Sequence, residues 1–97
     1  MPDYRFSKSA KNDLLEIAQY GDQHFGTEES DRYRDQIKQR FSLLAQQPLL
    51  YPAVDHICKG YRRTVCGVHS IYYRIESGTV EIMRILKHQD LAKAFRK

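Results

Sequence analysis

VHSIYYRIESGTVEIMRIL, the stretch from Val68 to Leu86, determines the fold class. Both of its halves are rich in β-branched and aromatic residues, which favour strands, and Glu76–Thr79 between them has the composition of a turn. We therefore predict two paired strands, Val68–Ile75 and Val80–Leu86. A third strand, Tyr61–Cys66, is predicted just before them across a very short connection.

The side-chain pattern of these strands indicates how the sheet is covered. Side chains alternate between the two faces of a strand, so Ile71, Tyr73 and Ile75 share one face, which we predict packs against helices. The strand Val80–Leu86 is apolar on both sides, so alternation does not orient it. That pattern favours a central strand with both faces covered.

Two helices are predicted before the sheet. Apolar residues recur at intervals of three and four through Ser9–Phe25, and Ser7 is placed to cap this helix. Gly26 fits the position just past the helix end, where a left-handed backbone is easiest. Thr27 is expected to cap the second helix, which must end before Pro48 because proline cannot continue it.

The remaining segments complete an α+β architecture. Tyr4–Phe6 alternates with charge and is predicted as a short first strand, and residues 49–59 are predicted as a loop. The expected order is β-α-α-β-β-β, with an antiparallel helical hairpin packed on a small, mainly antiparallel sheet. A chain of 97 residues supports one core, so residues 1–97 are predicted to form a single domain.

The composition is that of a globular protein of the cytoplasm. Hydrophobic residues make up 41% of the chain and charged residues 29%, which argues against disorder. The apolar runs are short, whereas a membrane span needs about 20 residues. Met1–Arg5 carries an acid and a base where a signal peptide would be apolar. We therefore expect no membrane association and a cytoplasmic location.

Positive charge is concentrated in the second half of the chain. Residues 1–55 hold seven Lys or Arg against nine Asp or Glu, a net charge of −2. Residues 56–97 hold nine against three, a net charge of +6. This asymmetry favours an acidic partner, either nucleic acid or an acidic protein segment.

The cations of the predicted sheet are the candidates for binding that partner. Arg84 interrupts an apolar strand, so its guanidinium needs a carboxylate, phosphate or water. Two interpretations stay open: a partner binds Arg84, or an acid of the helical hairpin, Glu76 or Glu81 neutralises it. Arg62 and Arg63 are adjacent in a strand and must face opposite sides.

No metal or cofactor is predicted. His56, Cys58, Cys66 and His69 offer four zinc-ligand types within fourteen residues, but their spacing matches no common zinc module. In a cytoplasmic chain the two cysteines are expected to be reduced and structural.

The sequence carries no paired-carboxylate motif, nucleophile elbow or glycine-rich phosphate loop, so no catalytic residues are predicted. Metal-independent RNA cleavage would need a general acid and base with cations around the phosphate. The residues that could supply them are His69 or His88 together with Arg62, Arg63 and Arg84.

Six motifs follow one another along the chain: Ser9–Ile17, Leu43–Pro48, Gly60–Arg63, His69–Ile75, Val80–Leu86 and Gln89-Asp90. Together they cover nearly the whole chain. In the order and spacing of these motifs the sequence resembles the ParE toxins of the RelE/ParE superfamily.

The resemblance implies the toxin of a type II toxin–antitoxin system that inhibits DNA gyrase without catalysing a reaction. It implies a ParD-like antitoxin that wraps the toxin in a hetero-oligomer, with no direct nucleic-acid binding by the toxin alone. The C-terminal segment Leu91–Lys97 would contribute to toxicity. The residues assigned to antitoxin or target binding are Arg62, Arg74, Arg84, Lys87, His88, Phe95 and Arg96.

The other branch of the superfamily provides the alternative function. RelE-like ribonucleases cut messenger RNA on the ribosome and tend to carry a tyrosine or histidine near the C-terminus. This chain has no tyrosine after Tyr73, whereas His88 keeps the alternative open. In that case Arg62, Arg63, Arg84 and His88 would be the catalytic residues.

Overall fold

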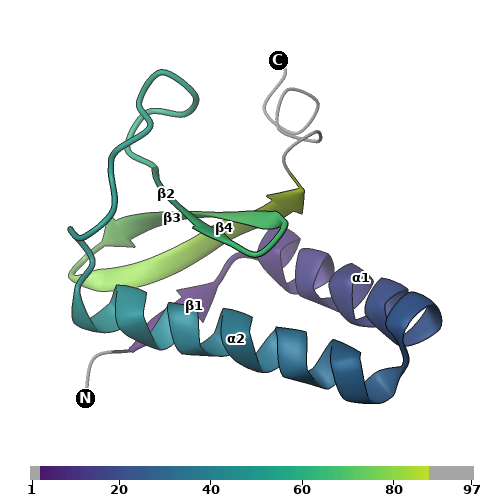
Figure 1. Cartoon of the computed structure of the whole chain (residues 1–97). Helices are drawn as coiled ribbons and strands as arrows, with labels where there is room; N and C mark the ends of the chain where they lie inside the picture. Colours follow the sequence, from purple (N-terminus) through teal and green to yellow (C-terminus); the bar gives the residue numbers. More distant parts are fainter. Residues whose placement is uncertain (1–2, 88–97) are drawn as a thin grey trace.

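The computed structural model describes residues 3–87 and has six elements of secondary structure (Figure 1). They are β1 (Tyr4–Phe6), α1 (Lys8–Phe25), α2 (Thr27–Gln46), β2 (Arg62–Cys66), β3 (His69–Glu76) and β4 (Thr79–Lys87). The predicted order β-α-α-β-β-β and the α+β class are therefore confirmed. Neither helix within the described residues is long and apolar enough to cross a membrane.

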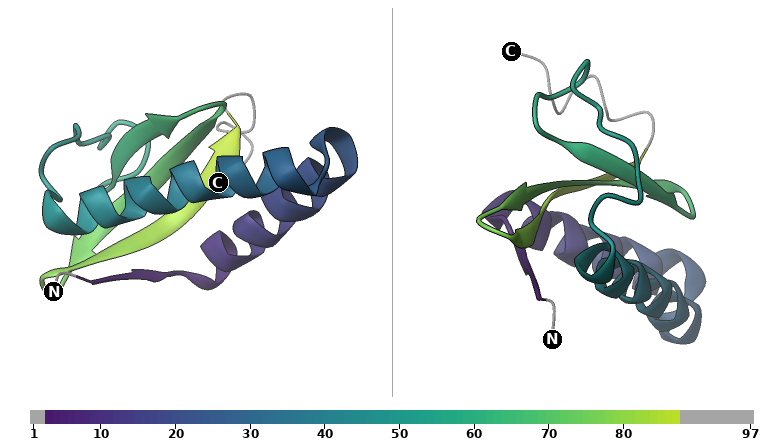
Figure 2. Two further views of the ribbon diagram at one scale, coloured as in Figure 1. Left: turned by 60° about the horizontal axis from the view of Figure 1, so that its bottom comes forward. Right: turned by 90° about the vertical axis from the view of Figure 1, so that its left-hand side faces the viewer.

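The four strands form one sheet in the order β1-β4-β3-β2. β1 pairs in parallel with β4, whereas the β4–β3 and β3–β2 pairs are antiparallel. The prediction that the last strand is central is confirmed, because β4 lies between the first and third strands. The two helices cover one face of this sheet, and the chain between α2 and β2 crosses to the opposite face (Figure 2).

A β-bulge explains why alternation could not orient β4. Tyr72 pairs with Arg84 and Tyr73 pairs with Ile82, so Met83 is an extra residue on β4. The bulge shifts the alternation by one position. As a result Ile82 and Ile85, three residues apart, both join the core beneath the helices.

The main core lies between the helices and the sheet. Ile71 and Tyr73 are fully buried in it, as predicted, against Ile37 and Phe41 of α2. Ile75 of the same strand is 39% exposed, so the prediction for this residue was wrong. A second, smaller cluster covers the opposite face of the sheet, where the loop residues Val54, Ile57 and Tyr61 pack on Tyr72 and Leu86.

The helix boundaries differ from expectation at the interhelical turn. Ser7 caps α1 as predicted, since its hydroxyl accepts the Ala10 N–H at 3.0 Å. Gly26 separates the two helices with φ +83°, a backbone conformation that side chains disfavour. Because Gly26 itself occupies the cap position of α2, Thr27 is the first residue of that helix and makes no capping bond, contrary to the prediction.

The two-residue turn between β2 and β3 is anchored to α2 by Tyr33. Its hydroxyl donates to the Cys66 carbonyl at 3.1 Å, accepts the Val68 N–H at 3.1 Å and lies 2.7 Å from Nδ1 of His69. Burial raises the pKa of this hydroxyl above its ordinary value. The ring packs directly against Gly67, whose φ is +61°.

We predict that Gly67→Ala lowers the free energy of unfolding by about 2–4 kcal/mol. A methyl group there would lie 2.5 Å from the Tyr33 ring, which its hydrogen bonds hold in place, and alanine disfavours a positive φ. Gly78→Ala is the matched control, because Gly78 also has a positive φ but no atom lies within 4 Å of its added methyl. It should cost only about 1 kcal/mol. Urea denaturation measures both, and equal losses would contradict the role given to Tyr33.

Candidate functional site

The Arg84 guanidinium is neutralised inside the chain by Asp13 of α1. Nε and Nη2 of Arg84 donate to the two carboxylate oxygens of Asp13 at 2.9 and 3.1 Å. These bonds raise the pKa of Arg84 above its ordinary value. Of the two interpretations of this arginine, the ion pair with an acid of the helical hairpin is the one that the structure shows.

Asp13 also completes the edge of β4. It is only 6% exposed, and its Oδ2 accepts the backbone N–H of Ile85 at 2.9 Å. β1 ends at Phe6, which pairs with Ile82, so this part of the β4 edge has no strand beside it. The Asp13 carboxylate therefore satisfies a buried N–H that a longer first strand would have bound.

Arg74 is likewise paired with a carboxylate. Its Nη2 and Nε lie 2.8 and 2.9 Å from Oε1 of Glu81 on the neighbouring strand, and Glu76 lies 4.0 Å away. Arg5 of β1 shares Glu81 at 3.6 Å. The positive charge of Arg74 is thus balanced within the sheet.

The strand register resolves the orientation of Arg62 and Arg63. Arg62 pairs with Tyr73, which lies in the core beneath the helices, and its Nη1 donates to the Tyr51 carbonyl at 2.6 Å. Arg63 pairs with Tyr72, in line with Arg84 on the opposite face. The arginines proposed for RNA cleavage therefore do not share one face of the sheet.

Lys87, another predicted binding residue, also has a contact within the chain. Lys87 at the end of β4 places its ammonium 4.1 Å from the centroid of the Tyr20 ring. His88, Phe95 and Arg96 lie outside the described residues. Within residues 3–87 the predicted cations are thus not gathered on one vacant surface, and the binding of a partner by these residues stays a prediction. Within residues 3–87 no cluster of three or more metal-ligating side chains is found.

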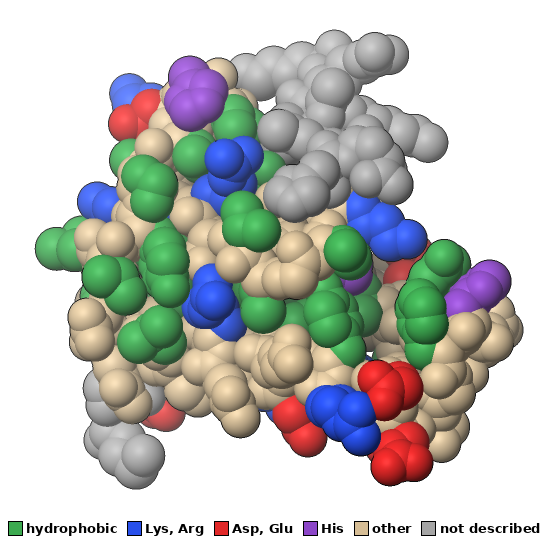
Figure 3. All heavy atoms as spheres, in the orientation of Figure 1, with side chains coloured by type: hydrophobic (Ala, Val, Ile, Leu, Met, Phe, Trp, Pro, Cys, Tyr) green, Lys and Arg blue, Asp and Glu red, His purple; other side chains and the backbone are tan. Residues whose placement is uncertain are grey.

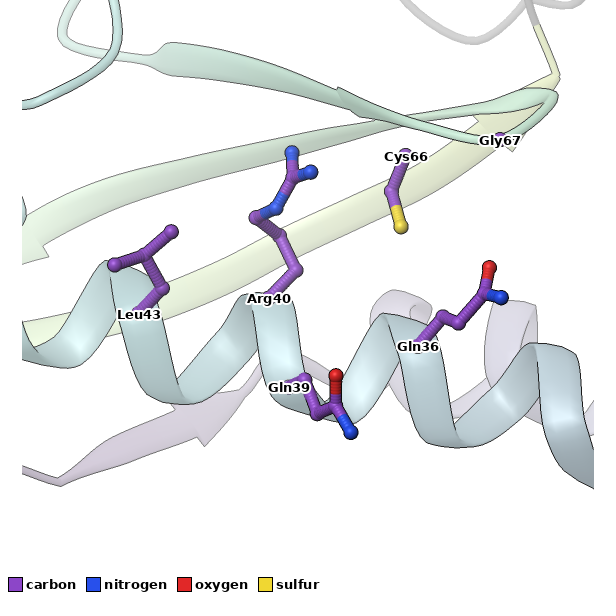
Figure 4. A pocket seen from close by; sticks show the side chains of 6 residues that line it. All are labelled: Gln36, Gln39, Arg40, Leu43, Cys66 and Gly67. Atoms are coloured by element: carbon purple, nitrogen blue, oxygen red, sulfur yellow. The ribbon is translucent and has the colours of Figure 1, made fainter.

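A shallow groove runs between α2 and β2 (Figure 4). Its lining residues are Gln36, Gln39, Arg40, Leu43, Cys66 and Gly67. In Figure 4 the Arg40 side chain extends from α2 toward the sheet. The Nη1 atom of Arg40 donates to both the Thr64 hydroxyl and the Val65 carbonyl, the latter at 2.8 Å.

Several apolar side chains are exposed at the two ends of this region. Val65 and Val68, at or next to the β2–β3 turn, are 46% and 59% exposed. Leu49 and Leu50, just past α2, are also exposed. Hydrophobic side chains gather over the end of α2 and the loop that follows it (Figure 3). The groove itself combines the cation of Arg40 with the apolar side chain of Leu43, which suits a protein segment better than a nucleic acid.

Sequence reasoning did not single out Arg40. It lies among the four arginines and lysines of α2, and nothing in the spacing separates it from Arg32, Arg34 or Lys38. Its neighbours Ile37, Phe41 and Leu44 form the buried stripe, which places Arg40 at the edge of that stripe. Only the packing of α2 against β2 shows that this side chain enters a groove.

Comparison with known proteins identifies the family. The family model for the ParE toxin of the type II toxin–antitoxin system parDE matches residues 4–92. Toxin ParE1 of Caulobacter vibrioides is 34% identical over 91 residues, covering 94% of this chain and 93% of the relative. Toxin ParE1 of Mycobacterium tuberculosis is 30% identical over 87 residues, covering 89% and 88%.

A solved structure shows the same fold. It is described as the chromosomal ParDE TA system from P. aeruginosa, and it superposes with a TM-score of 0.78. The match covers 90% of this chain and 96% of that chain at 19% identity. The predicted resemblance is therefore confirmed by both sequence and fold.

We predict that Asp13→Ala lowers the free energy of unfolding by about 3–5 kcal/mol, because it leaves a partly buried guanidinium and the Ile85 N–H without their acceptor. Asp31→Ala breaks an exposed ion pair with Arg34 and is the control, with an expected loss below about 1 kcal/mol. Adding Arg84→Met to Asp13→Ala should recover part of the loss. Thermal or urea unfolding gives the values, and an Asp13 variant as stable as the Asp31 control would refute this role.

Proposed function

The chain belongs to the family of ParE toxins of type II toxin–antitoxin systems, and on that premise we propose that it inhibits DNA gyrase and is neutralised by a ParD-like antitoxin. The observation that carries the proposal is the family match over residues 4–92. The chain would act in the cytoplasm, where it would meet both gyrase and the antitoxin. The toxin would be held as a hetero-oligomer with its antitoxin.

The arrangement of the arginines supports inhibition by binding rather than RNA cleavage. A metal-independent ribonuclease needs cations free to stabilise the charge that develops on the phosphate. Arg84 is instead bound to Asp13, and Arg62 bonds a backbone carbonyl on the face opposite to Arg63. Arg62 and Arg84 would have to leave their present contacts to act with Arg63 on one phosphate.

The groove between α2 and β2 supports the antitoxin as a direct protein partner. Peptide segments commonly bind in grooves that offer an apolar surface and a few fixed polar groups. Leu43 supplies apolar surface on one wall of the groove, and Arg40 supplies the cation. An antitoxin segment lying there would cover part of the exposed apolar surface of the toxin.

We expect the purified chain in molar excess to abolish supercoiling of relaxed plasmid by DNA gyrase or to trap cleaved DNA. The same chain, preincubated with its antitoxin, should leave supercoiling unchanged, which controls for nonspecific effects of a basic protein. A translation reaction with defined messenger RNA, sampled for cleavage, runs in parallel. Full supercoiling activity at excess toxin together with messenger RNA cleavage would replace our proposal by the ribonuclease function.

A further inference from the structure

The Arg40 guanidinium differs from the other arginines of α2 in having no carboxylate partner. Arg32 pairs with Glu28 and Glu29, and Arg34 pairs with Asp22 and Asp31. Arg40 forms no ion pair with any residue of the described part of the chain, and its hydrogen bonds go to a hydroxyl and a carbonyl. Neutral acceptors fix the side chain but do not cancel its charge.

The position of Arg40 is fixed from three sides. Thr64 and Val65 of β2 hold Nη1, and the guanidinium carbon lies 5.5 Å from the centroid of the Tyr51 ring. Thr64 is itself 2% exposed, so the contact is rigid on the side of the sheet. A side chain held in this way loses little conformational freedom when it binds a ligand.

The hydrogen bonds of Arg40 within residues 3–87 involve Nη1 alone, so Nε and Nη2 are left without a hydrogen-bond partner in this part of the chain. These two nitrogens form one side of the guanidinium fork and match the two oxygens of a carboxylate. Arg84 uses the same pair of atoms to bind Asp13. The structure thus contains, in Arg84, an occupied example of the contact that Arg40 leaves open.

Arg40 lies at the outer edge of β2, the edge that does not pair with another strand of the described residues. Residues 63 and 65 of an antiparallel pair joined by a two-residue turn point their backbone groups away from β3. The N–H of Arg63 is taken by the Pro52 carbonyl at 3.2 Å, and the carbonyl of Val65 is taken by Arg40. These outward backbone groups are therefore occupied within the chain, and a partner that enters the groove at this edge meets the side chains of Arg40 and Leu43.

We propose that Arg40 is the charge anchor for the antitoxin: an Asp or Glu of an extended antitoxin segment binds Nε and Nη2 of Arg40, and a neighbouring apolar side chain packs on Leu43, which lines the same groove. The proposal rests on the proposed function, since it takes the antitoxin as the occupant of the groove. Charge complementarity selects this occupant. An uncancelled guanidinium beside an apolar side chain favours a carboxylate with an apolar neighbour.

The test compares Arg40→Gln with Arg32→Gln, a matched control on the same helix whose arginine is 59% exposed and already paired. Calorimetric titration with the purified antitoxin should show affinity lowered at least about tenfold for Arg40→Gln and less than about twofold for Arg32→Gln. Arg40→Lys, which keeps the charge but not the fork, should fall between the wild type and Arg40→Gln. Urea unfolding of each variant checks that the variant is folded.

A second measurement changes the antitoxin and compares its binding to the wild-type toxin and to Arg40→Gln. Each Asp and Glu in the toxin-binding segment of the antitoxin is changed to its amide, and one such change should weaken binding to the wild type but not to Arg40→Gln. If the folded Arg40→Gln chain binds as tightly as the wild type, or if no acid couples to Arg40, the anchor is refuted while the proposed function stands. If the wild-type chain binds no ParD-like antitoxin, the proposed function itself fails.

Discussion

The contact of Asp13 with Arg84 and Ile85 is the constraint on which the remaining structure depends. β1 is only three residues long and cannot accompany β4 along its whole length. α1 takes over the edge: the Ser7 N–H donates to Ile82 and its hydroxyl donates to Met83, and Asp13 then accepts from Ile85. One helix therefore serves as the continuation of a strand. This fixes its position beside the sheet and, through the turn at Gly26, the position of α2 as well.

The same contact changes the meaning of the charge distribution. The surplus of cations in the second half of the sequence suggests a broad basic surface, but Asp13 comes from the acidic first half and cancels Arg84. Glu81, one of the few acids in the second half, is shared by Arg5 and Arg74. Net charge along the chain therefore overstates the charge available to a partner. Arg40, by contrast, comes from the half with the negative balance and has no carboxylate partner among the described residues.

Much of the fold could be predicted because periodicity and turn residues report on local structure. Ser7 as a cap, the helix end at Gly26 and the alternation of Ile71 and Tyr73 all follow from neighbouring residues. The bulge at Met83 could not be predicted, since it depends on the register between two strands. The role of Arg40 was missed for the same kind of reason. Its surroundings are set by β2, more than twenty positions along the chain.

The parallel pairing of β1 with β4 has a consequence for how the protein is made. Tyr4 pairs with Val80, so the edge strand β1 and the central strand β4 come from segments translated at very different times. Until β4 is made, β1 has no partner strand, the sheet beneath the helices lacks a central strand, and Asp13 has no arginine. Contacts of such long sequence separation form late in folding. The sheet of this chain can therefore close only after residues 79–87 have been translated.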